Sequence, residues 1–314
     1  MPNLLDIKIP WLWSILVIIV CGTIIWGIMS PRLITSPPRD QNKSSPEEFD
    51  LAYEKVEFTS TDGLTLKGWF IPHLFNQHNN ALQKGAEFIP SREAKGTIIL
   101  CHGFGTSKSD LINFIPFLHK GHYNVFMFDF RAHGDSPGLC SLGYYEVNDL
   151  TGAINYLKTR PDVDAGKIGA IGISMGGAVA FMTAARNSDL KAVVSDSSFM
   201  SFERTVTKFA KLFYNLPKFP FVYITIKAVE WRLHFEDEEA DPVKYIGQIS
   251  PRAVFIIHGA EDQRVLPEDA RVLYEAAREP KQLWMVPEAD HLEAHGLWPA
   301  EYEKKIIDFF DKYL

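Results

Sequence analysis

Residues 168–188 read IGAIGISMGGAVAFMTAARNS, and this stretch decides the fold that we predict for the 314-residue chain. A short apolar run ends at Ile173, a glycine-rich turn follows, and a run with helical spacing begins after it. The turn matches G-x-S-x-G, a pattern that bends the backbone sharply, exposes the serine hydroxyl and requires small neighbours. Gly172 and Gly176 are those neighbours. An idle serine in a glycine-rich turn is the competing interpretation, but the position between strand and helix favours Ser174 as a nucleophile.

Short apolar runs of the same kind recur along the chain, at intervals that leave room for a helix between them. Such runs are typical of parallel strands that are buried on both faces. They alternate with segments of helical spacing, which indicates a doubly wound α/β sheet. Residues 55–72 read KVEFTSTDGLTLKGWFIP and predict an antiparallel hairpin ahead of that sheet. The other predicted strands begin at Thr97, Val125, Ile168, Ala192, Ala253 and Leu283.

One connection between predicted strands is longer than the others, the one from the strand at Ala192 to the strand at Ala253. Its surplus, residues 201–245, is rich in aromatic residues, and Phe209 and Phe213 fall at near-helical spacing. Sites in open α/β sheets lie outside the carboxyl ends of the strands. We therefore interpret the insertion as a helical lid, with extra packing against the sheet edge as the alternative.

A serine hydroxyl is a poor nucleophile until a base accepts its proton. His291 is the best candidate among the 10 histidines, because it follows the last predicted strand. A loop at that point lies at the same edge of the sheet as Ser174. His295, four residues further on, is the competitor.

The base requires a carboxylate that orients it. Asp262 follows the strand that begins at Ala253, and it gives the chain order serine, aspartate, histidine expected with this serine motif. Glu261 is adjacent, and Asp196 ends an earlier strand, so both stay open as alternatives. Asp290, beside the proposed base, is interpreted as an exposed loop residue.

The negative oxygen that forms on an attacked carbonyl requires two preorganised N–H donors. The residue after the nucleophile, Met175, supplies one of them. The other should come from residues 102–105, after an earlier strand, and we assign it to Phe104. His133 and His258 are interpreted as hydrogen-bonded loop histidines. The sequence indicates no cofactor and no metal site.

The N-terminal residues differ in character from the rest of the chain. Residues 11–29 carry no charged side chain, and as a helix they would extend roughly 28 Å, close to the hydrocarbon thickness of a bilayer. Trp11, Trp13 and Trp26 lie near the ends, where indole rings favour the membrane interface. A core helix would carry a polar face, and a cleaved signal peptide would have a shorter apolar segment and a cleavage site. We therefore predict one retained transmembrane anchor within residues 1–30, and a single-pass membrane location.

The sequence leaves the orientation of this anchor open. Lys8 precedes the apolar segment and Arg32, Arg39 and Lys43 come after it, a bias that slightly favours a cytoplasmic location for the catalytic domain. N-terminal anchors nevertheless often export the next domain. Residues 31–50 are rich in proline, serine and charge and predict a flexible linker.

The composition is that of a folded protein, with 46% hydrophobic and 23% charged residues and a formal net charge of -7. This charge, and the lack of a basic stripe with interleaved aromatic residues, argue against a nucleic-acid partner. The 3 cysteines form neither a disulfide framework nor a CxxC pair for zinc. We expect a monomer.

Six segments of the chain, in this order, resemble the α/β-hydrolase superfamily. The chain looks most like its bacterial serine-aminopeptidase-like (S33-type) branch, and it also resembles membrane-anchored α/β-hydrolase-domain proteins. The resemblance implies an eight-stranded sheet flanked by helices, a Ser-His-Asp triad and no cofactor. We therefore assign residues 51–314 to one α/β-hydrolase domain. The six segments are CHGFGTSKSD from Cys101, FDFRAHGDSPG from Phe128, GISMGG from Gly172, SDSSF from Ser195, HGAEDQRVLP from His258 and ADHLEAHG from Ala289.

Together these features predict a serine hydrolase, esterase-like or lipase-like or peptidase-like, that cleaves an ester, thioester or amide through an acyl-enzyme on Ser174. Two alternatives stay open: an acyltransferase with the same triad, and a catalytically silent binding protein with the same fold. Dehalogenation would require an aspartate at the nucleophile position. The aromatic insertion and the anchor favour a small-molecule acyl substrate with an apolar, lipid-like acyl group.

Overall fold

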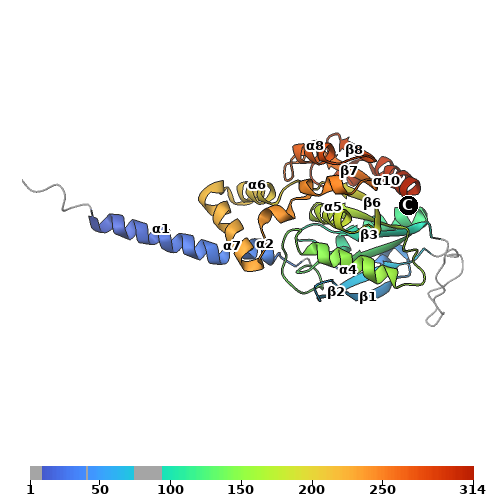
Figure 1. Ribbon diagram of the computed structural model, residues 1–314, viewed down its shortest axis with the longest axis horizontal. Helices are drawn as coiled ribbons and strands as arrows, with labels where there is room; N and C mark the ends of the chain where they lie inside the picture. The colour runs from blue at the N-terminus through green and yellow to red at the C-terminus, as the bar shows by residue number, and fades with distance from the viewer. Residues whose placement is uncertain (1–8, 40–41, 74–93) are drawn as a thin grey trace, which may run out of the picture.

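The computed structural model describes residues 9–39, 42–73 and 94–314 (Figure 1). Eight strands within these residues form one sheet, in the order β1-β2-β4-β3-β5-β6-β7-β8. The predicted α/β-hydrolase sheet is therefore confirmed. The strands are β1 (Glu54–Thr59), β2 (Thr65–Ile71), β3 (Gly96–Cys101), β4 (Tyr123–Phe128), β5 (Ile168–Ile173), β6 (Leu190–Asp196), β7 (Ala253–Gly259) and β8 (Lys281–Val286).

The sheet is mostly parallel. Strands β3 to β8 pair in parallel with their neighbours, whereas β1 and β2 form the predicted antiparallel hairpin and β2 pairs antiparallel with β4. Because parallel strands point the same way, the ends of β3, β5, β6, β7 and β8 meet at one edge. Every residue that we predicted for the chemistry lies on a segment that follows one of these strand ends.

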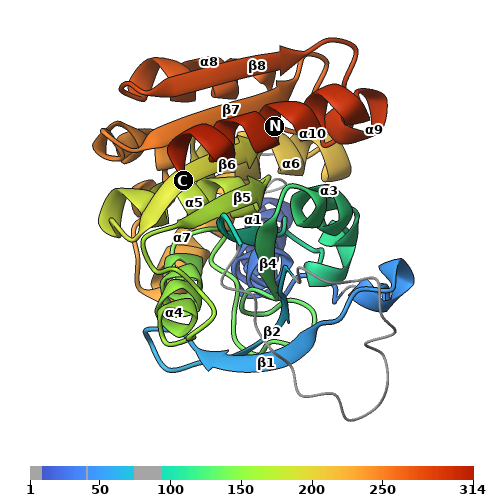
Figure 2. The ribbon, with the colours of Figure 1, turned by 90° about the vertical axis from the view of Figure 1, so that its right-hand side faces the viewer.

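Helices cover both faces of the sheet (Figure 2). Ile98 and Leu100 of β3 pack into one hydrophobic core with α3 and α10, whereas Ile99 and Cys101 pack into the other with α4 and α5. This alternation follows from the two-residue period of a strand. The helices are α1 (Ile9–Met29), α2 (Arg32–Thr35), α3 (Ile115–Lys120), α4 (Glu146–Lys158), α5 (Met175–Arg186), α6 (Phe202–Tyr214), α7 (Tyr223–Leu233), α8 (Pro267–Ala276), α9 (Ala294–Leu297) and α10 (Pro299–Tyr313).

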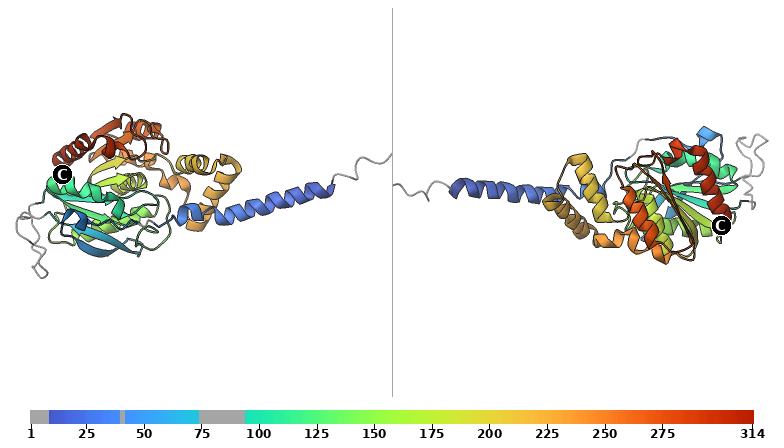
Figure 3. Two further views of the ribbon diagram at one scale, coloured as in Figure 1. Left: turned by 180° about the vertical axis from the view of Figure 1, so that it is seen from behind. Right: turned by 90° about the horizontal axis from the view of Figure 1, so that it is seen from above.

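The insertion between β6 and β7 is helical, as predicted. It contains α6 and α7, which are joined by the kinked turn η3 (Lys218–Val222), where Phe219 is not helical (φ −104°, ψ 134°). The remaining short helices are 3₁₀ turns: η1 (Pro46–Phe49), η2 (Lys108–Phe114), η4 (Asp237–Ala240), η5 (Pro242–Lys244) and η6 (Ile246–Gln248). Figures 1 and 3 show α6 and α7 standing between the sheet and the N-terminal helix.

Helix α1 extends away from the sheet (Figure 3). By length and composition it is apolar enough to cross a membrane, and most of its described side chains are exposed. At about 1.5 Å per residue its 21 residues extend roughly 31 Å. Its last turns contact α7, where a Cβ on Gly27 would lie 3.3 Å from the Ile224 side chain.

The segment that we predicted to be a flexible linker differs from that expectation. Its first residues form α2, whose Ile34 and Thr35 are buried. The Cys140 N–H donates to the carbonyl oxygen of Thr35 at 3.0 Å. Arg39 donates to the carbonyl oxygens of Gly134 and Ser136. A composition rich in proline and charge did not reveal this packing, because it depends on partners about 100 residues away in the sequence.

Candidate active site

Ser174 lies on a sharp turn between β5 and α5. Its backbone has φ 52° and ψ −113°, a strained combination for a residue with a side chain. The turn is held by the Ser174 N–H, which donates to the carbonyl oxygen of Asp196 at 2.8 Å. The side chain is only 9% exposed and lines a cavity at the carboxyl edge of the sheet.

The glycines on either side of the turn are required by close approach of the backbone. A Cβ on Gly172 would lie 2.3 Å from the carbonyl oxygen of Gly176, and a Cβ on Gly176 would lie 2.1 Å from that of Cys101. Neither contact is sterically possible. The small residues of the sequence motif are therefore explained by the packing of this turn against β3.

The loop after β3 approaches the turn from the other side. Thr106 Oγ1 donates to the carbonyl oxygen of Gly103 at 3.0 Å, and His102 Nδ1 lies 2.7 Å from the same oxygen. His102 Nε2 accepts from the Phe130 N–H, so Nδ1 carries the proton and donates. Phe104 follows and lines the same cavity as Ser174. No hydrogen bond joins the N–H of Phe104 to another residue within the described part of the chain.

Met175 is the first residue of α5. The first N–H groups of a helix have no partner within that helix. The Met175 N–H makes no hydrogen bond to any residue that the structure describes. Both N–H groups that we predicted as oxyanion donors therefore belong to backbone beside Ser174.

The structure brings the predicted base and acid together. His291 Nδ1 lies 2.7 Å from Asp262 Oδ2. The His291 ring lines the same cavity as Ser174. Because the carboxylate is an acceptor, this contact places a proton on Nδ1 and leaves Nε2 as the nitrogen that accepts one.

Asp262 is held by several donors in a buried position, where it is 1% exposed. Its Oδ1 accepts the backbone N–H groups of Arg264 and Val265, at 2.8 and 2.9 Å. Burial opposes ionisation of this carboxyl group, but hydrogen bonds from His258 and His291 outweigh burial. The pKa of Asp262 consequently lies well below its usual value.

His258 was interpreted as a loop histidine, and that interpretation is wrong. It lies on β7, fully buried, with its Nε2 2.9 Å from the carbonyl oxygen of Val265 and 3.3 Å from Asp262 Oδ2. Burial lowers the pKa of His258, but the contacts with Asp262 and Val265 outweigh burial and raise it. Asp262 therefore faces two histidines, one in the cavity and one in the core. His133 is hydrogen-bonded as expected, to the carbonyl oxygen of Arg131.

The alternative carboxylates lie elsewhere. Asp196 accepts from the hydroxyl groups of Tyr302 and Ser197, at 2.9 Å each. Glu261 is exposed. Asp290 is half-buried instead of exposed, and its Oδ1 accepts the N–H groups of Gln263 and His291, which holds the loop.

The competing base also has a different environment. His295 Nε2 lies 3.2 Å from Glu303 Oε1, and its ring stacks on Tyr302. It does not line the cavity that contains Ser174. Of the two histidines, only His291 shares that cavity.

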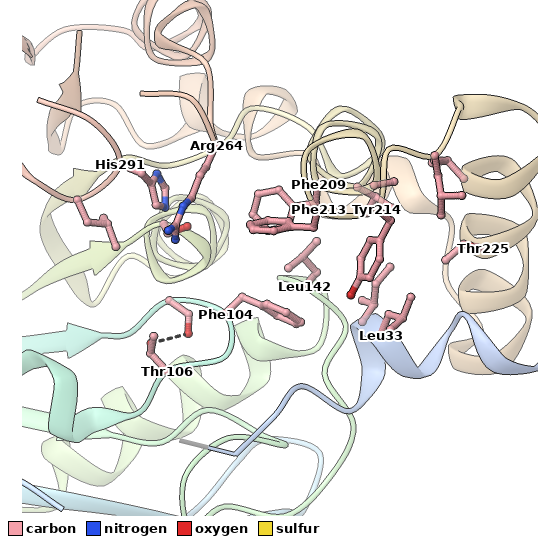
Figure 4. Close-up of a pocket in the computed structure, with 18 of the residues that line it drawn as sticks. Leu33, Phe104, Thr106, Leu142, Phe209, Phe213, Tyr214, Thr225, Arg264 and His291 are labelled. Atoms are coloured by element: carbon pink, nitrogen blue, oxygen red, sulfur yellow. Dashed lines mark hydrogen bonds between the residues drawn. The ribbon is translucent and has the colours of Figure 1, made fainter. Parts of the chain in front are cut away.

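The cavity has a volume of about 330 Å³ and is lined mostly by apolar side chains. Figure 4 shows Phe209, Phe213 and Tyr214 of α6 facing Phe104 and Leu142 across it. Ser174 and His291 line the same space, so the insertion does form a wall of the cavity that contains them.

The N-terminal segment contributes a further part of this wall. Trp26 of α1 and Leu33 and Ile34 of α2 line the cavity. The Trp26 Nε1 donates to the carbonyl oxygen of Phe221 and to Thr225 Oγ1, at 3.0 Å each. The indole is thus hydrogen-bonded to η3 and to α7 of the insertion.

Three residues of this site were not found from the sequence: His258, Arg264 and Trp26. Arg264 lies two residues after Asp262, and its side chain lies beside His291 (Figure 4). Trp26 was assigned to a membrane interface, because an indole near the end of an apolar helix has no other local signal. His258 is adjacent to a strand end, and its contact with Asp262 follows from the turn after β7.

Known proteins resemble this chain in sequence and structure. A family model described as alpha/beta hydrolase fold matches residues 96–220. The protein YfhR of Escherichia coli (strain K12) is 30% identical over 262 residues, which are 82% of this chain and 80% of YfhR. The polyketide transferase ATR5 of Stachybotrys chlorohalonatus is 23% identical over 307 residues, covering 83% of this chain and 97% of ATR5.

Among solved structures, the esterase Pf2001 of Pyrococcus furiosus superposes with a TM-score of 0.71 and 27% identity. The match covers 89% of this chain and 98% of the esterase chain. With its relationship to YfhR and its likeness to an esterase, the chain belongs to the α/β-hydrolase fold family, and the family relationship supports a hydrolase activity.

Proposed function

We propose that the protein is a serine hydrolase that cleaves a carboxylic ester, thioester or amide through an acyl-enzyme on Ser174. One observation carries the proposal. His291 Nδ1 lies 2.7 Å from buried Asp262, and the same histidine lines one cavity with a serine on a strained strand-to-helix turn. This arrangement supports Ser174 as the nucleophile, His291 as the base and Asp262 as the carboxylate that orients the base.

The proposed mechanism follows from these positions. The Ser174 hydroxyl attacks the acyl carbonyl while Nε2 of His291 accepts its proton. Asp262 holds the imidazole by its other nitrogen and stabilises the charged form. His291 then protonates the leaving group, and an acyl-enzyme remains. Water, activated by the same histidine, releases the acid.

The oxyanion is stabilised by the N–H groups of Phe104 and Met175. Two N–H groups beside Ser174 support this assignment, because neither forms a hydrogen bond to another described residue and both belong to backbone fixed by the turn and by the loop that holds Gly103. Preorganised donors of this kind are worth most where water is excluded. The apolar walls of the cavity supply that condition.

The acyl group of the substrate is apolar. This part of the proposal is supported by the aromatic side chains of α6 and by Leu142, which line the cavity beside Ser174. Apolar surface buried there contributes about 25 cal/mol per Å². The insertion acts as the lid that covers this acyl group.

The protein works at a membrane, with α1 as a single-pass anchor. Helix α1 is apolar throughout and extends away from the sheet. The end of the lid nearest to it also exposes large apolar side chains, which suits contact with the bilayer surface. These side chains are Leu212, Phe213, Tyr214, Phe219 and Tyr223.

The direct test is labelling with a fluorophosphonate probe, which reacts with activated serines. We expect the wild type to label and to hydrolyse p-nitrophenyl esters, and Ser174→Ala to lose labelling and at least about 10³-fold in kcat. Ser198→Ala is the control, because Ser198 is buried outside the cavity. Strong labelling of Ser174→Ala would overturn the assignment.

A second candidate function is acyl transfer to an alcohol or amine by the same triad. It is favoured by the similarity to ATR5, which is described as a polyketide transferase. Product analysis with water and competing acceptors separates the two. A transferase would form the transfer product at acceptor concentrations far below that of water, whereas a hydrolase would release the free acid.

A further inference from the structure

A second cavity lies beside the one that contains Ser174. It has a volume of about 540 Å³ and is bounded by α6, by Lys218, by residues 264–266 and by Asp269 in the first turn of α8. Five basic side chains and two acidic ones line it, in a chain whose formal net charge is -7. We call it the basic groove, and its basic residues are Arg204, Lys208, Lys211, Lys218 and Arg264.

The acidic residues of the basic groove are already paired. Asp269 lies 2.7 Å from Arg204, and Glu203 forms an ion pair with Lys218. No ion pair to another described residue involves Lys208, and Lys211 donates to the neutral amide of Asn215. The groove therefore holds positive charge in excess of what the described chain neutralises.

Arg264 connects the two cavities, since it lines both. Its backbone is fixed, because its N–H donates to Asp262 at 2.8 Å. Its guanidinium lies beside His291 in Figure 4 and forms no ion pair within the described residues. A cation thus lies next to the proposed base, and no carboxylate of the described residues forms an ion pair with it.

Helix α6 separates the cavities by presenting a different stripe to each. Val206, Phe209 and Phe213 line the cavity with Ser174, whereas Arg204, Lys208 and Lys211 line the basic groove. Both sets follow the three-to-four-residue spacing of one helical face. One side of the helix suits an acyl chain, and the next suits an anion.

From this arrangement we infer that the substrate is an acyl ester or thioester whose leaving group carries a phosphate. The inference rests on the proposed function and names its substrate class. The acyl chain lies in the apolar cavity, the carbonyl carbon at Ser174, and the phosphate in the basic groove with Arg264. Guanidinium groups bind phosphate oxygens through two parallel hydrogen bonds.

The hydrolysis leaves the phosphate unchanged: water supplies the hydroxyl of the free acid and the proton of the released alcohol or thiol.

The test compares matched substrates that differ only in phosphate, with the full-length protein in neutral detergent. One pair is butyryl-4′-phosphopantetheine and butyryl-pantetheine, and the other is hexanoylglycerol 3-phosphate and hexanoylglycerol. Short acyl chains keep all four in solution, so attraction to a charged membrane surface does not contribute. The pair that shows the preference distinguishes a coenzyme thioester from a lipid head group.

We expect the wild type to prefer the phosphate-bearing member of one pair by about tenfold or more in kcat/KM, as a charged hydrogen bond allows. Arg264→Gln should bring this ratio close to one, and added salt should lower it in the wild type. Arg271→Gln is the matched control, because this exposed arginine of α8 lines neither cavity. The double variant Lys208→Gln, Lys211→Gln carries the test if Arg264→Gln does not fold.

A ratio near one for both pairs in the wild type, or an unchanged ratio in Arg264→Gln, would overturn the inference. Calorimetric binding of free coenzyme A and of glycerol 3-phosphate provides a readout that does not depend on turnover. If the wild type binds these anions, Arg264→Gln does not, and no substrate is hydrolysed, then the anion site is retained and the proposed function is rejected. Ser174-dependent hydrolysis without phosphate binding would retain the function and reject this substrate class.

Discussion

At the residue scale, Asp262 is the point on which the candidate site converges. Oδ2 of this buried carboxylate contacts His291 Nδ1, and Oδ1 accepts two backbone N–H groups. His258 Nε2 lies 3.3 Å from Oδ2. A carboxylate with this many donors is charged and fixed in orientation. It therefore orients the imidazole of His291 toward the cavity.

Replacing Asp262 by Asn should remove activity while leaving the shape of the site. The amide presents a donor to His291 where the carboxylate accepted, so the wrong tautomer of the imidazole is favoured. We expect kcat for a p-nitrophenyl ester to fall by about 10⁴-fold. Glu261→Gln, at the adjacent exposed position, should keep the wild-type rate. Comparable losses in both variants would contradict the assignment of Asp262.

The lowered pKa of Asp262 also predicts a pH dependence of stability. A carboxyl group whose pKa is depressed by folding stabilises the folded state above its unfolded pKa of about 3.9. That contribution is lost as pH falls through the folded pKa. The difference in Tm between the wild type and Asp262→Asn should therefore be largest near neutral pH and shrink below about pH 4. A difference in Tm that does not change with pH would contradict the lowered pKa of Asp262.

At the element scale, α1 and the lid form one unit. Trp26 of α1 contacts Phe221 edge-on, with ring centroids 5.3 Å apart, and its Nε1 donates to the carbonyl oxygen of Phe221 in η3. Thr225 of α7 in turn donates to Ser30 Oγ at 2.9 Å. The end of the apolar helix is therefore a wall of the cavity as well as a candidate anchor.

Replacing Trp26 by Ala should weaken binding of long acyl chains. The indole lines the cavity beyond the nucleophile, so its removal costs apolar contact with a long chain and not with a short one. We expect KM to rise about tenfold for a p-nitrophenyl decanoate, as loss of a buried aromatic contact implies, with the acetate little changed. Trp13→Ala, on the same helix and 62% exposed, is the control. An equal change for both chain lengths would count against α1 as a wall.

At the scale of the whole molecule, the sheet, lid and α1 follow one another along the longest axis (Figure 1). The cavity lies between lid and sheet, near the base of α1. An amphiphile that leaves a bilayer along this axis would meet the apolar lid before Ser174. This arrangement supports the proposal that the enzyme takes its substrate from a membrane.

This arrangement predicts that the full-length protein stays with membranes after washes with high salt and alkaline carbonate. Replacing Val17 and Ile18 by Arg should move the protein to the soluble fraction, since each arginine at the centre of a spanning helix costs about 2.5–3.5 kcal/mol. Both side chains are exposed, so the α/β domain should fold in this variant. Release of the wild type by salt alone would show that α1 does not span. Protease accessibility in intact cells then identifies the side that the domain faces.

Much of the fold was predictable from local patterns. The strand ends at Cys101, Ile173 and Gly259 lie where short apolar runs stop, because a strand buried on both faces admits few polar residues. The insertion was recognised by its length and aromatic content. The packing of α2 was not recognised, because a helix of four residues is too short to show an apolar periodicity in the sequence.

The sequence by itself determined the strand-to-helix turn at Ser174 and the order in which Asp262 and His291 come after it. These are local or ordinal properties, and close backbone approach at Gly172 and Gly176 makes the motif specific. Only the tertiary structure decided the rest: that His258 shares the carboxylate, that Arg264 lines both the apolar cavity and the basic groove, and that Trp26 lines the apolar cavity. In each of these three cases the partner of a side chain is set by packing between distant segments of the chain, which no local sequence pattern encodes.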